Sequence, residues 1–220
     1  ECQVLFFVIT CFFVSCLTEC VVYKRAAGFF SSSSLCTWGA AIPHLVGDRD
    51  VRLLLLISPY LSSDDVAVLR RAADPVRREE ALQELGDRIL IDAVEFAANS
   101  SDRDTRLRLF LWLLSVERLE IRFALPSHLE EPGLYHEKMG VFEFSDGSKV
   151  AFTGSANESF HGHSGNYEAI DVYRDWHPED IERVKTKETQ FDDSWTGKSV
   201  GMTVVPLSED AFRYIRERAP

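Results

Sequence analysis

The fold is decided by residues 135–176, which read YHEKMGVFEFSDGSKVAFTGSANESFHGHSGNYEAIDVYRDW. Within them, residues 139–144 are largely apolar and aromatic, residues 145–148 (SDGS) favour a turn, and residues 150–153 are mostly apolar again. Two such runs joined by a short turn predict a β-hairpin. Residues 167–173 predict a third strand beside it, so the stretch should bring residues that are distant in sequence to one place.

The first strand of this hairpin carries a candidate nucleophile and a candidate cation. On a β-strand, residues two apart point to the same side, so His136 and Lys138 should converge on one substrate while Glu137 points away. A neutral imidazole can attack phosphorus, and an ammonium group can stabilise phosphate oxygens. The cleavage of a phosphodiester without a metal requires both groups.

The returning strand leads to further polar groups. Gly154 permits close backbone approach, and the Ser155 hydroxyl and the Asn157 amide can donate hydrogen bonds to phosphate oxygens. The third strand brings Glu168 alongside, where a carboxylate can hold the imidazole N–H of His136 and raise its nucleophilicity. The sequence therefore predicts an active site that acts on a phosphate.

Three motifs in this stretch resemble those of the phospholipase D superfamily, whose signature is H-x-K, then G-S-x-N, then N-x-E. They stand here in the same order as His136-x-Lys138, Gly154-Ser155-x-Asn157 and Asn166-x-Glu168. The joint match is far more specific than any one part. The resemblance implies a phospholipase-D-like fold and metal-independent phosphodiester chemistry through a phosphohistidine, with no metal and no other cofactor. It makes His136, Lys138 and Glu168 catalytic, and makes Gly154, Ser155 and Asn157 the phosphate-binding residues.

The match has two departures from the family pattern. The acid that usually follows the lysine by five residues is Glu143 here rather than Asp. That position is expected to be structural. The gap between the first two motifs is also a few residues longer, which fits a longer hairpin.

The wider chain is similar to the phospholipase-D-like domain found ahead of DEAD/DEAH-type helicases in bacterial and archaeal defence and restriction proteins. The similar segments are CLTECVVYKRAAGFFSSSSL, LLLISPYLSSDD, HEKMGVFEF, VAFTGSANES and NYEAIDVYRDW. The resemblance covers roughly residue 12 to the end of the chain. It implies a nuclease that cleaves DNA, with a helicase region that these residues do not contain.

The length suits a single domain. With 220 residues, of which 45% are hydrophobic, the chain can bury a sizeable core. We expect one phospholipase-D-like domain over residues 1–220, with the place of residues 1–11 left open. Its parts are an N-terminal half (12–130), the catalytic motif region (131–176) and a C-terminal helix-strand-helix (177–220).

Periodicity predicts the elements outside the motif region. Residues 50–58 (DVRLLLLIS) form a near-continuous aliphatic run, which is typical of a central strand buried on both faces. Further strands are expected at residues 20–30, ending at Gly28, and at 119–125 and 203–205. Helices are expected up to residue 45 after a serine cap at 31–34, and at 62–73, 75–98, 105–115, 178–191 and after Ser208. Strands that alternate with helices indicate an α/β fold, a mixed β-sheet sandwiched between helices.

The formal net charge of −11 argues against a broadly cationic surface. Any contact with nucleic acid must therefore use a local basic patch. The chain contains no G-x-x-x-x-G-K-[ST] loop, so these residues are not themselves an ATP-driven motor.

The first residues are the most awkward to interpret. Residues 4–17 are almost all apolar or small, but the run is short for a membrane span and no basic residue precedes it. A buried N-terminal helix is favoured over an anchor, and no stable membrane insertion is expected. The five cysteines fit buried free thiols in a reducing compartment, which favours a cytoplasmic location; they are Cys2, Cys11, Cys16, Cys20 and Cys36.

His161 and His163 leave a metal site open as an alternative. A loop pair without cysteines or an arranged set of carboxylates is a weak ligand signal. The alternative expectation is that His161 or His163 lines the substrate entrance.

Three functions compete on this evidence. The first is a nuclease that hydrolyses DNA, the second is a phospholipid phosphodiesterase or transphosphatidylase that uses the same residues, and the third is a non-catalytic DNA-docking module with the same fold. The mechanism also needs a second histidine to protonate the leaving oxygen, yet the chain holds a single H-x-K. A homodimer, or a second H-x-K-containing chain, is therefore expected to complete the site.

Overall fold

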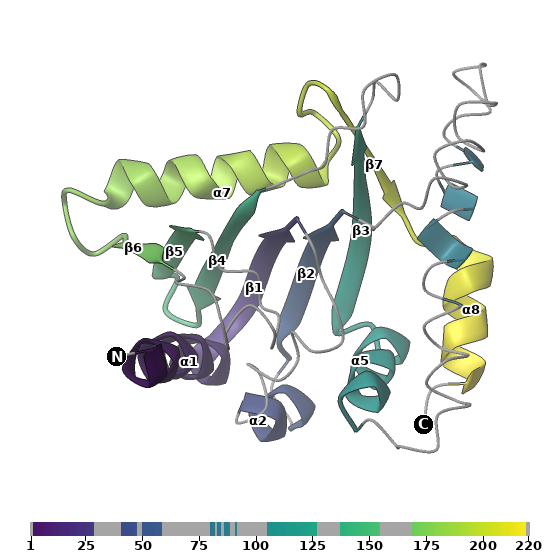
Figure 1. Cartoon of the computed structure of the whole chain (residues 1–220), viewed down its shortest axis with the longest axis horizontal. Coiled ribbons are helices and arrows are strands. Elements are labelled where there is room, and N and C mark those ends of the chain that lie inside the picture. The colour runs from purple at the N-terminus through teal and green to yellow at the C-terminus, as the bar shows by residue number, and fades with distance from the viewer. Residues whose placement is uncertain are drawn as a thin grey trace.

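A computed structural model gives the fold of the chain and describes residues 2–28, 41–47, 50–58, 80–81, 83–84, 86–88, 91, 105–126, 137–154 and 169–218. A seven-stranded sheet runs through these residues in the order β6-β5-β4-β1-β2-β3-β7 (Figure 1). Its strands are β1 (Cys20–Ala27), β2 (Arg52–Ile57), β3 (Leu119–Pro126), β4 (Lys138–Phe144), β5 (Lys149–Gly154), β6 (Ile170–Arg174) and β7 (Met202–Pro206). Strands β1, β2 and β3 are parallel, and every other pairing is antiparallel. The predicted mixed sheet is confirmed.

Helices cover both faces of this sheet. They are α1 (Cys2–Glu19), α2 (Ile42–Val46), α5 (Thr105–Ser115), α7 (Ile181–Trp195) and α8 (Glu209–Arg218). In Figure 1, α7 lies on one side of the sheet, and α1, α2 and α5 lie on the other. The buried residues divide into two clusters in the same way, one shared with α1, α2, α5 and α8 and the other with α7. The predicted α/β sandwich is confirmed.

Strand β2 is the central strand that its aliphatic run predicted. It pairs with β1 on one side and with β3 on the other. Leu53 and Leu55 are buried on the α1 face, whereas Leu56 is buried on the α7 face. Both faces of the strand are therefore apolar, which explains why the run has no alternation.

Aromatic rings fill the core between α1 and the sheet. The ring of Tyr23 on β1 stacks on Phe142 of β4, with centroids 4.3 Å apart and planes 4° apart. Phe13 of α1 meets Phe152 of β5 edge to face at 5.0 Å. Phe13 and Leu17 are fully buried, so the apolar N-terminal run does form a helix that packs on the sheet. Among the residues that the structure describes, no helix has the length and apolar character to cross a membrane.

The cysteine prediction is confirmed in part. The thiols of Cys16 and Cys20 are free and buried, and burial raises the pKa of Cys16 to about 12. Cys11 is also free but exposed, because its position on α1 faces away from the sheet. The expectation of a buried thiol is therefore wrong for Cys11.

Several element boundaries differ from those expected. Strand β6 begins at Ile170, and residues 167–168 lie outside the described part of the chain. Helix α7 begins at Ile181 rather than at residue 178, because residues 178–180 form a turn in which Asp180 N donates to His177 O at 2.9 Å. The helix continues to Trp195, since its buried residues extend the apolar stripe beyond residue 191.

Other predicted helices have mixed outcomes. Residues 31–34 and 62–73 lie outside the described residues, and those described between 80 and 91 are helical. Helix α5 has the predicted bounds. Helix α8 begins after Ser208, whose Oγ accepts a hydrogen bond from Ala211 N at 3.1 Å, so the predicted cap is confirmed.

An ion cluster ties α7 to the sheet. Glu188 of α7 accepts hydrogen bonds from Lys149 Nζ at 2.8 Å and from Lys24 Nζ at 3.0 Å. Lys24 also contacts Asp192 at 2.7 Å. Desolvation alone would raise the pKa of Glu188, but the bonds from two ammonium groups outweigh it and hold the pKa below its ordinary value of 4.5.

Glu188→Gln should lower the free energy of unfolding by about 1 kcal/mol at neutral pH, because the lost bonds are charge-assisted but partly screened by solvent. Since the folded-state pKa of Glu188 is lowered, its contribution is present above the unfolded pKa and is lost as the pH falls through the folded pKa. Denaturant unfolding at neutral and acidic pH measures this, with Glu182→Gln on the exposed side of α7 as control. If Glu188→Gln is as much less stable than wild type at acidic pH as at neutral pH, the lowered pKa of Glu188 in the folded state would be contradicted.

Candidate active site

One row of residues joins four strands at a single edge of the sheet. Ile170 of β6 pairs with Gly154 of β5, and Lys138 of β4 pairs with Ala27 of β1. The antiparallel register of β4 and β5 then sets Lys138 beside Gly154. The first residue of β4 and the last residue of β5 therefore lie next to each other, although they belong to different sequence motifs.

The parallel strands β1 and β2 end at this edge, and β3 ends close to it. Ala27 and Ile57 are the last residues of β1 and β2 and pair with each other, and Ile57 pairs with Phe123 of β3, three residues before that strand ends at Pro126. The chain passes from β1 to β2 and β3 on one side and then returns to β4 on the other side of β1 (Figure 1). Ligands of open α/β sheets bind outside the carboxyl ends of strands where the strand order reverses. The junction of β1 and β4 is such a point.

Lys138 belongs to the face that α1 covers. Met139 and Val141 are buried in the cluster shared with α7, and Glu137 Oε1 lies 3.9 Å from Lys187 Nζ of α7. Because side chains alternate along a strand, Lys138 is directed to the opposite face. Glu137 does point away from Lys138, as the alternation predicted.

Lys138 differs from three other lysines of the structure in its ion pairing. Lys24, Lys149 and Lys187 each form an ion pair with an acidic residue. Within the described part of the chain, Lys138 forms none, and its side chain is only partly buried. A partly exposed cation at the end of a strand is suited to hold an anion.

Gly154 is required by strand pairing. A Cβ atom at this position would lie 2.1 Å from Ala169 O and 2.9 Å from Ile170 Cα. The backbone of β6 therefore approaches β5 more closely than any side chain at residue 154 permits. The neighbouring strand thus accounts for a glycine at this position, and the predicted role of Gly154 in binding phosphate stays a prediction.

Glu143 lies at the far end of β4 from Lys138. Its carboxylate is 3.7 Å from Lys149 Nζ, so it belongs to the ion cluster under α7. This position fits the structural role expected for it.

Arg25 is a charged residue near the edge that the sequence analysis did not single out. Its side chain is 1% exposed, and its guanidinium lies 5.1 Å from the ring centroid of Phe152. It pairs in register with Gly140, two residues before Ala27 on β1. The available signal was the Lys24-Arg25 pair in an otherwise apolar strand, because alternation sends the two side chains to opposite faces.

The other predicted site residues lie outside the described part of the chain. They are His136, Ser155, Asn157 and Glu168, together with Asn166 and the loop histidines His161 and His163. Their nearest described neighbours in sequence are Glu137, Gly154 and Ala169, at the starts of β4 and β6 and the end of β5. Within the described residues, no group of three or more His, Cys, Asp or Glu is placed to hold a metal ion.

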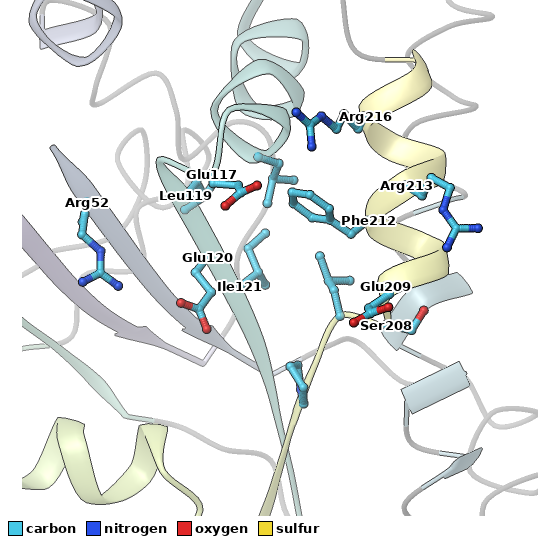
Figure 2. A pocket seen from close by; sticks show the side chains of 13 residues that line it. Arg52, Glu117, Leu119, Glu120, Ile121, Ser208, Glu209, Phe212, Arg213 and Arg216 are labelled. Carbon is cyan, nitrogen blue, oxygen red and sulfur yellow. The ribbon is translucent and has the colours of Figure 1, made fainter. Parts of the chain in front are cut away.

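A cavity of about 730 Å³ lies at the opposite end of the sheet. It is bounded by Arg52 and Leu119, which begin β2 and β3, and by α8. Figure 2 shows Phe212 and Arg216 pointing from α8 towards β3 and Glu117. The lining combines three arginines with three glutamates, so it has no excess of positive charge for a phosphate. It is separate from the edge that holds Lys138.

Comparisons with protein-family models and with curated proteins found no match to this chain.

Proposed function

We propose that the chain is a metal-independent phosphodiesterase with a phospholipase-D-like fold, and that its substrate is DNA. The observation that carries the proposal is the row of Lys138, Gly154 and Ile170 at one edge of the sheet. The H-x-K motif ends at Lys138, the G-S-x-N motif begins at Gly154, and the N-x-E motif ends two residues before Ile170. The three motifs span residues 136 to 168, and the described residues that belong to them or adjoin them, Lys138, Gly154 and Ile170, lie in one row.

In the proposed reaction, the imidazole of His136 attacks phosphorus and the bond to the leaving oxygen breaks. Lys138, Ser155 and Asn157 stabilise the charge on the phosphate oxygens, and Glu168 holds the imidazole in the reactive tautomer. A water molecule then attacks the phosphohistidine, breaks the P–N bond and restores His136. The leaving oxygen takes its proton from a second acid, which later removes a proton from the water.

The second acid is proposed to come from a second copy of the chain. The six histidines of the sequence include one H-x-K, at His136. A two-fold axis at this edge of the sheet would set His136 opposite its symmetry mate and supply the missing proton donor. A helicase region elsewhere in a longer protein would deliver DNA to the same edge.

Hydrolysis of bis(p-nitrophenyl) phosphate by the wild-type chain should continue at an unchanged rate in EDTA. A nucleophile from His136 and a positive charge from Lys138 do the work that a metal-bound hydroxide and its metal do in other phosphodiesterases. Release of p-nitrophenol with and without the chelator measures this. Loss of the rate in EDTA and its return with magnesium or zinc would contradict the proposal and favour a site at His161 and His163.

The substrate is tested in the same preparation. Single-stranded DNA, double-stranded DNA and phosphatidylcholine vesicles are compared at equal phosphodiester concentration. Cleavage of DNA alone would support the proposed nuclease. Cleavage of the lipid alone would contradict it and indicate a phospholipid phosphodiesterase. Binding of DNA without cleavage would replace it with a docking module.

A further inference from the structure

We propose that the cavity bounded by β3 and α8 is a separate binding site for a small zwitterion with an apolar body, of the class of a short apolar peptide with free ends. The cavity measures about 730 Å³, which is within the size range of small-molecule sites. It lies at the amino ends of β2 and β3, whereas Lys138 lies at the opposite edge of the sheet. The inference therefore goes beyond the proposed function and does not depend on it.

Glu117, which lines the cavity, has a backbone conformation that side chains disfavour. It follows α5 with a φ of 59°. Its N–H donates to Leu114 O, and the N–H of Arg118 donates to Leu113 O, both at 3.0 Å. These two bonds define a helix-ending turn in which glycine is the usual residue, because a Cβ atom is strained in the left-handed region. A glutamate at this position therefore destabilises the turn relative to a glycine.

The negative charge of Glu117 is also placed unfavourably. Glu117 comes two residues after the end of α5, where the helix dipole is negative and favours cations. The next residue does not neutralise it, because the guanidinium of Arg118 donates to Leu45 O and Gly47 O at 2.8 Å. Residues held in strained conformations cluster at ligand-binding sites. A bound ammonium group would offset both the carboxylate and the negative end of the helix.

Arg216 supplies the opposite charge from α8. Figure 2 shows Arg216 and Phe212 directed from α8 towards Glu117. Within the part of the chain that the structure describes, neither Glu117 nor Arg216 takes part in an ion pair. Arg213, by contrast, pairs with Asp210 on the same helix at 3.1 Å. The cavity thus presents an anion and a cation that are both available to a ligand.

The cavity also has apolar walls. They include Leu119 and Ile121 from β3, and Leu207 and Phe212 from the segment that leads into α8 and from α8 itself. Leu207 and Phe212 are only partly buried, so a ligand that covers them removes apolar surface from water. A zwitterion with an apolar body matches the two charges and the walls together. A free phosphate would be repelled by Glu117 and would leave the walls uncovered.

Calorimetric titration with leucyl-leucine and two capped forms of it tests the site. N-acetyl-leucyl-leucine lacks the ammonium group, and leucyl-leucine amide lacks the carboxylate. Each capped form should bind the wild-type chain roughly tenfold more weakly than the free peptide, the range for one lost charge-assisted contact.

Variants of the two charged residues assign each end of the peptide. Glu117→Gln should bind leucyl-leucine roughly tenfold more weakly, yet bind the N-acetyl form as wild type does, because that form has no ammonium group to lose. Arg216→Met should weaken leucyl-leucine by a similar factor and leave binding of the amide unchanged. Arg108→Met is the control, since Arg108 is an exposed arginine of α5 outside the cavity lining. It should bind all three peptides within about twofold of wild type.

Glu117→Gly distinguishes binding from stability. The glycine relieves the left-handed backbone and removes the charge beside α5, so the midpoint of denaturant unfolding should rise while binding of leucyl-leucine falls as in Glu117→Gln. A Glu117→Gly chain that is less stable than wild type would show that the glutamate serves the fold, and would overturn the inference.

Two binding results would also overturn it. One is a wild-type chain that binds none of the peptides up to their solubility limits. The other is a Glu117→Gln chain that binds leucyl-leucine as tightly as wild type, or that loses the free and the N-acetyl peptide equally. None of these titrations involves a phosphodiester, so failure of this site would leave the proposed function standing.

Discussion

Lys138→Ala is expected to lower kcat for bis(p-nitrophenyl) phosphate by roughly 100- to 1,000-fold, the usual cost of removing one group that stabilises charge in the transition state. The fold should survive, because Lys138 is the first residue of β4 and its ammonium has no ion pair within the described residues. Its backbone is still held by pairing with Ala27. Activity should fall while the midpoint of denaturant unfolding stays within error of wild type.

Lys187→Ala provides the matched control. Lys187 is also a partly buried lysine near the start of β4, but it lies on α7 and pairs with Glu137 across the opposite face. Its loss should leave kcat unchanged and cost at most about 1 kcal/mol of stability. If Lys138→Ala and Lys187→Ala lost equal activity, the effect would come from positive charge on either face of the sheet. Lys138 would then have no specific role in the site.

Gly154→Ala adds one methyl group at this edge of the sheet, and we expect it to lower both stability and activity. The added Cβ would meet Ala169 O at 2.1 Å and Ile170 Cα at 2.9 Å, so β6 must move away from β5. We expect the free energy of unfolding to fall by about 2–3 kcal/mol, at the upper end for overpacking. Activity should fall as well, since the start of β6 adjoins the N-x-E motif and its displacement alters the candidate site.

Gly147→Ala is the control that distinguishes the steric clash of an added Cβ atom from the backbone cost of replacing a glycine. Gly147 lies in the turn of the same hairpin with φ of +85°, and nothing lies within 4 Å of a Cβ at that position. The substitution should cost about 1 kcal/mol through the left-handed backbone alone and leave turnover unchanged. Denaturant unfolding of both variants measures the difference. If Gly154→Ala were as stable and active as Gly147→Ala, the tight contact of β5 with β6 would be refuted.

The sequence predicted most of the sheet because its strands have strong local signals. The aliphatic run in β2 and the apolar, turn, apolar order of β4 and β5 each reflect burial that a single segment displays. The ends of α7 were missed for a different reason. Pro178 suits a first helical position, yet Asp180 closes a turn on His177, and only packing against the sheet extends the helix to Trp195.

The sequence motifs of the candidate site could be predicted, but the spatial arrangement of its residues could be predicted only in part. Spacing indicates that Lys138 and Gly154 can meet, and the β4–β5 register places them side by side. Arg25 could not be found this way, because its relation to Lys138 depends on which strand lies next to β1. That neighbour is β4, more than 100 residues later in the chain, and no local pattern specifies such a pairing.

The rate of bis(p-nitrophenyl) phosphate hydrolysis by His136→Ala protein tests the proposed mechanism most directly. The wild-type chain and the variant are prepared in parallel, with His177→Ala as a histidine control in the turn before α7. Without the imidazole no phosphohistidine can form, so His136→Ala should show no turnover above the buffer rate, while His177→Ala retains the wild-type rate. Undiminished hydrolysis by His136→Ala would contradict the phosphohistidine mechanism.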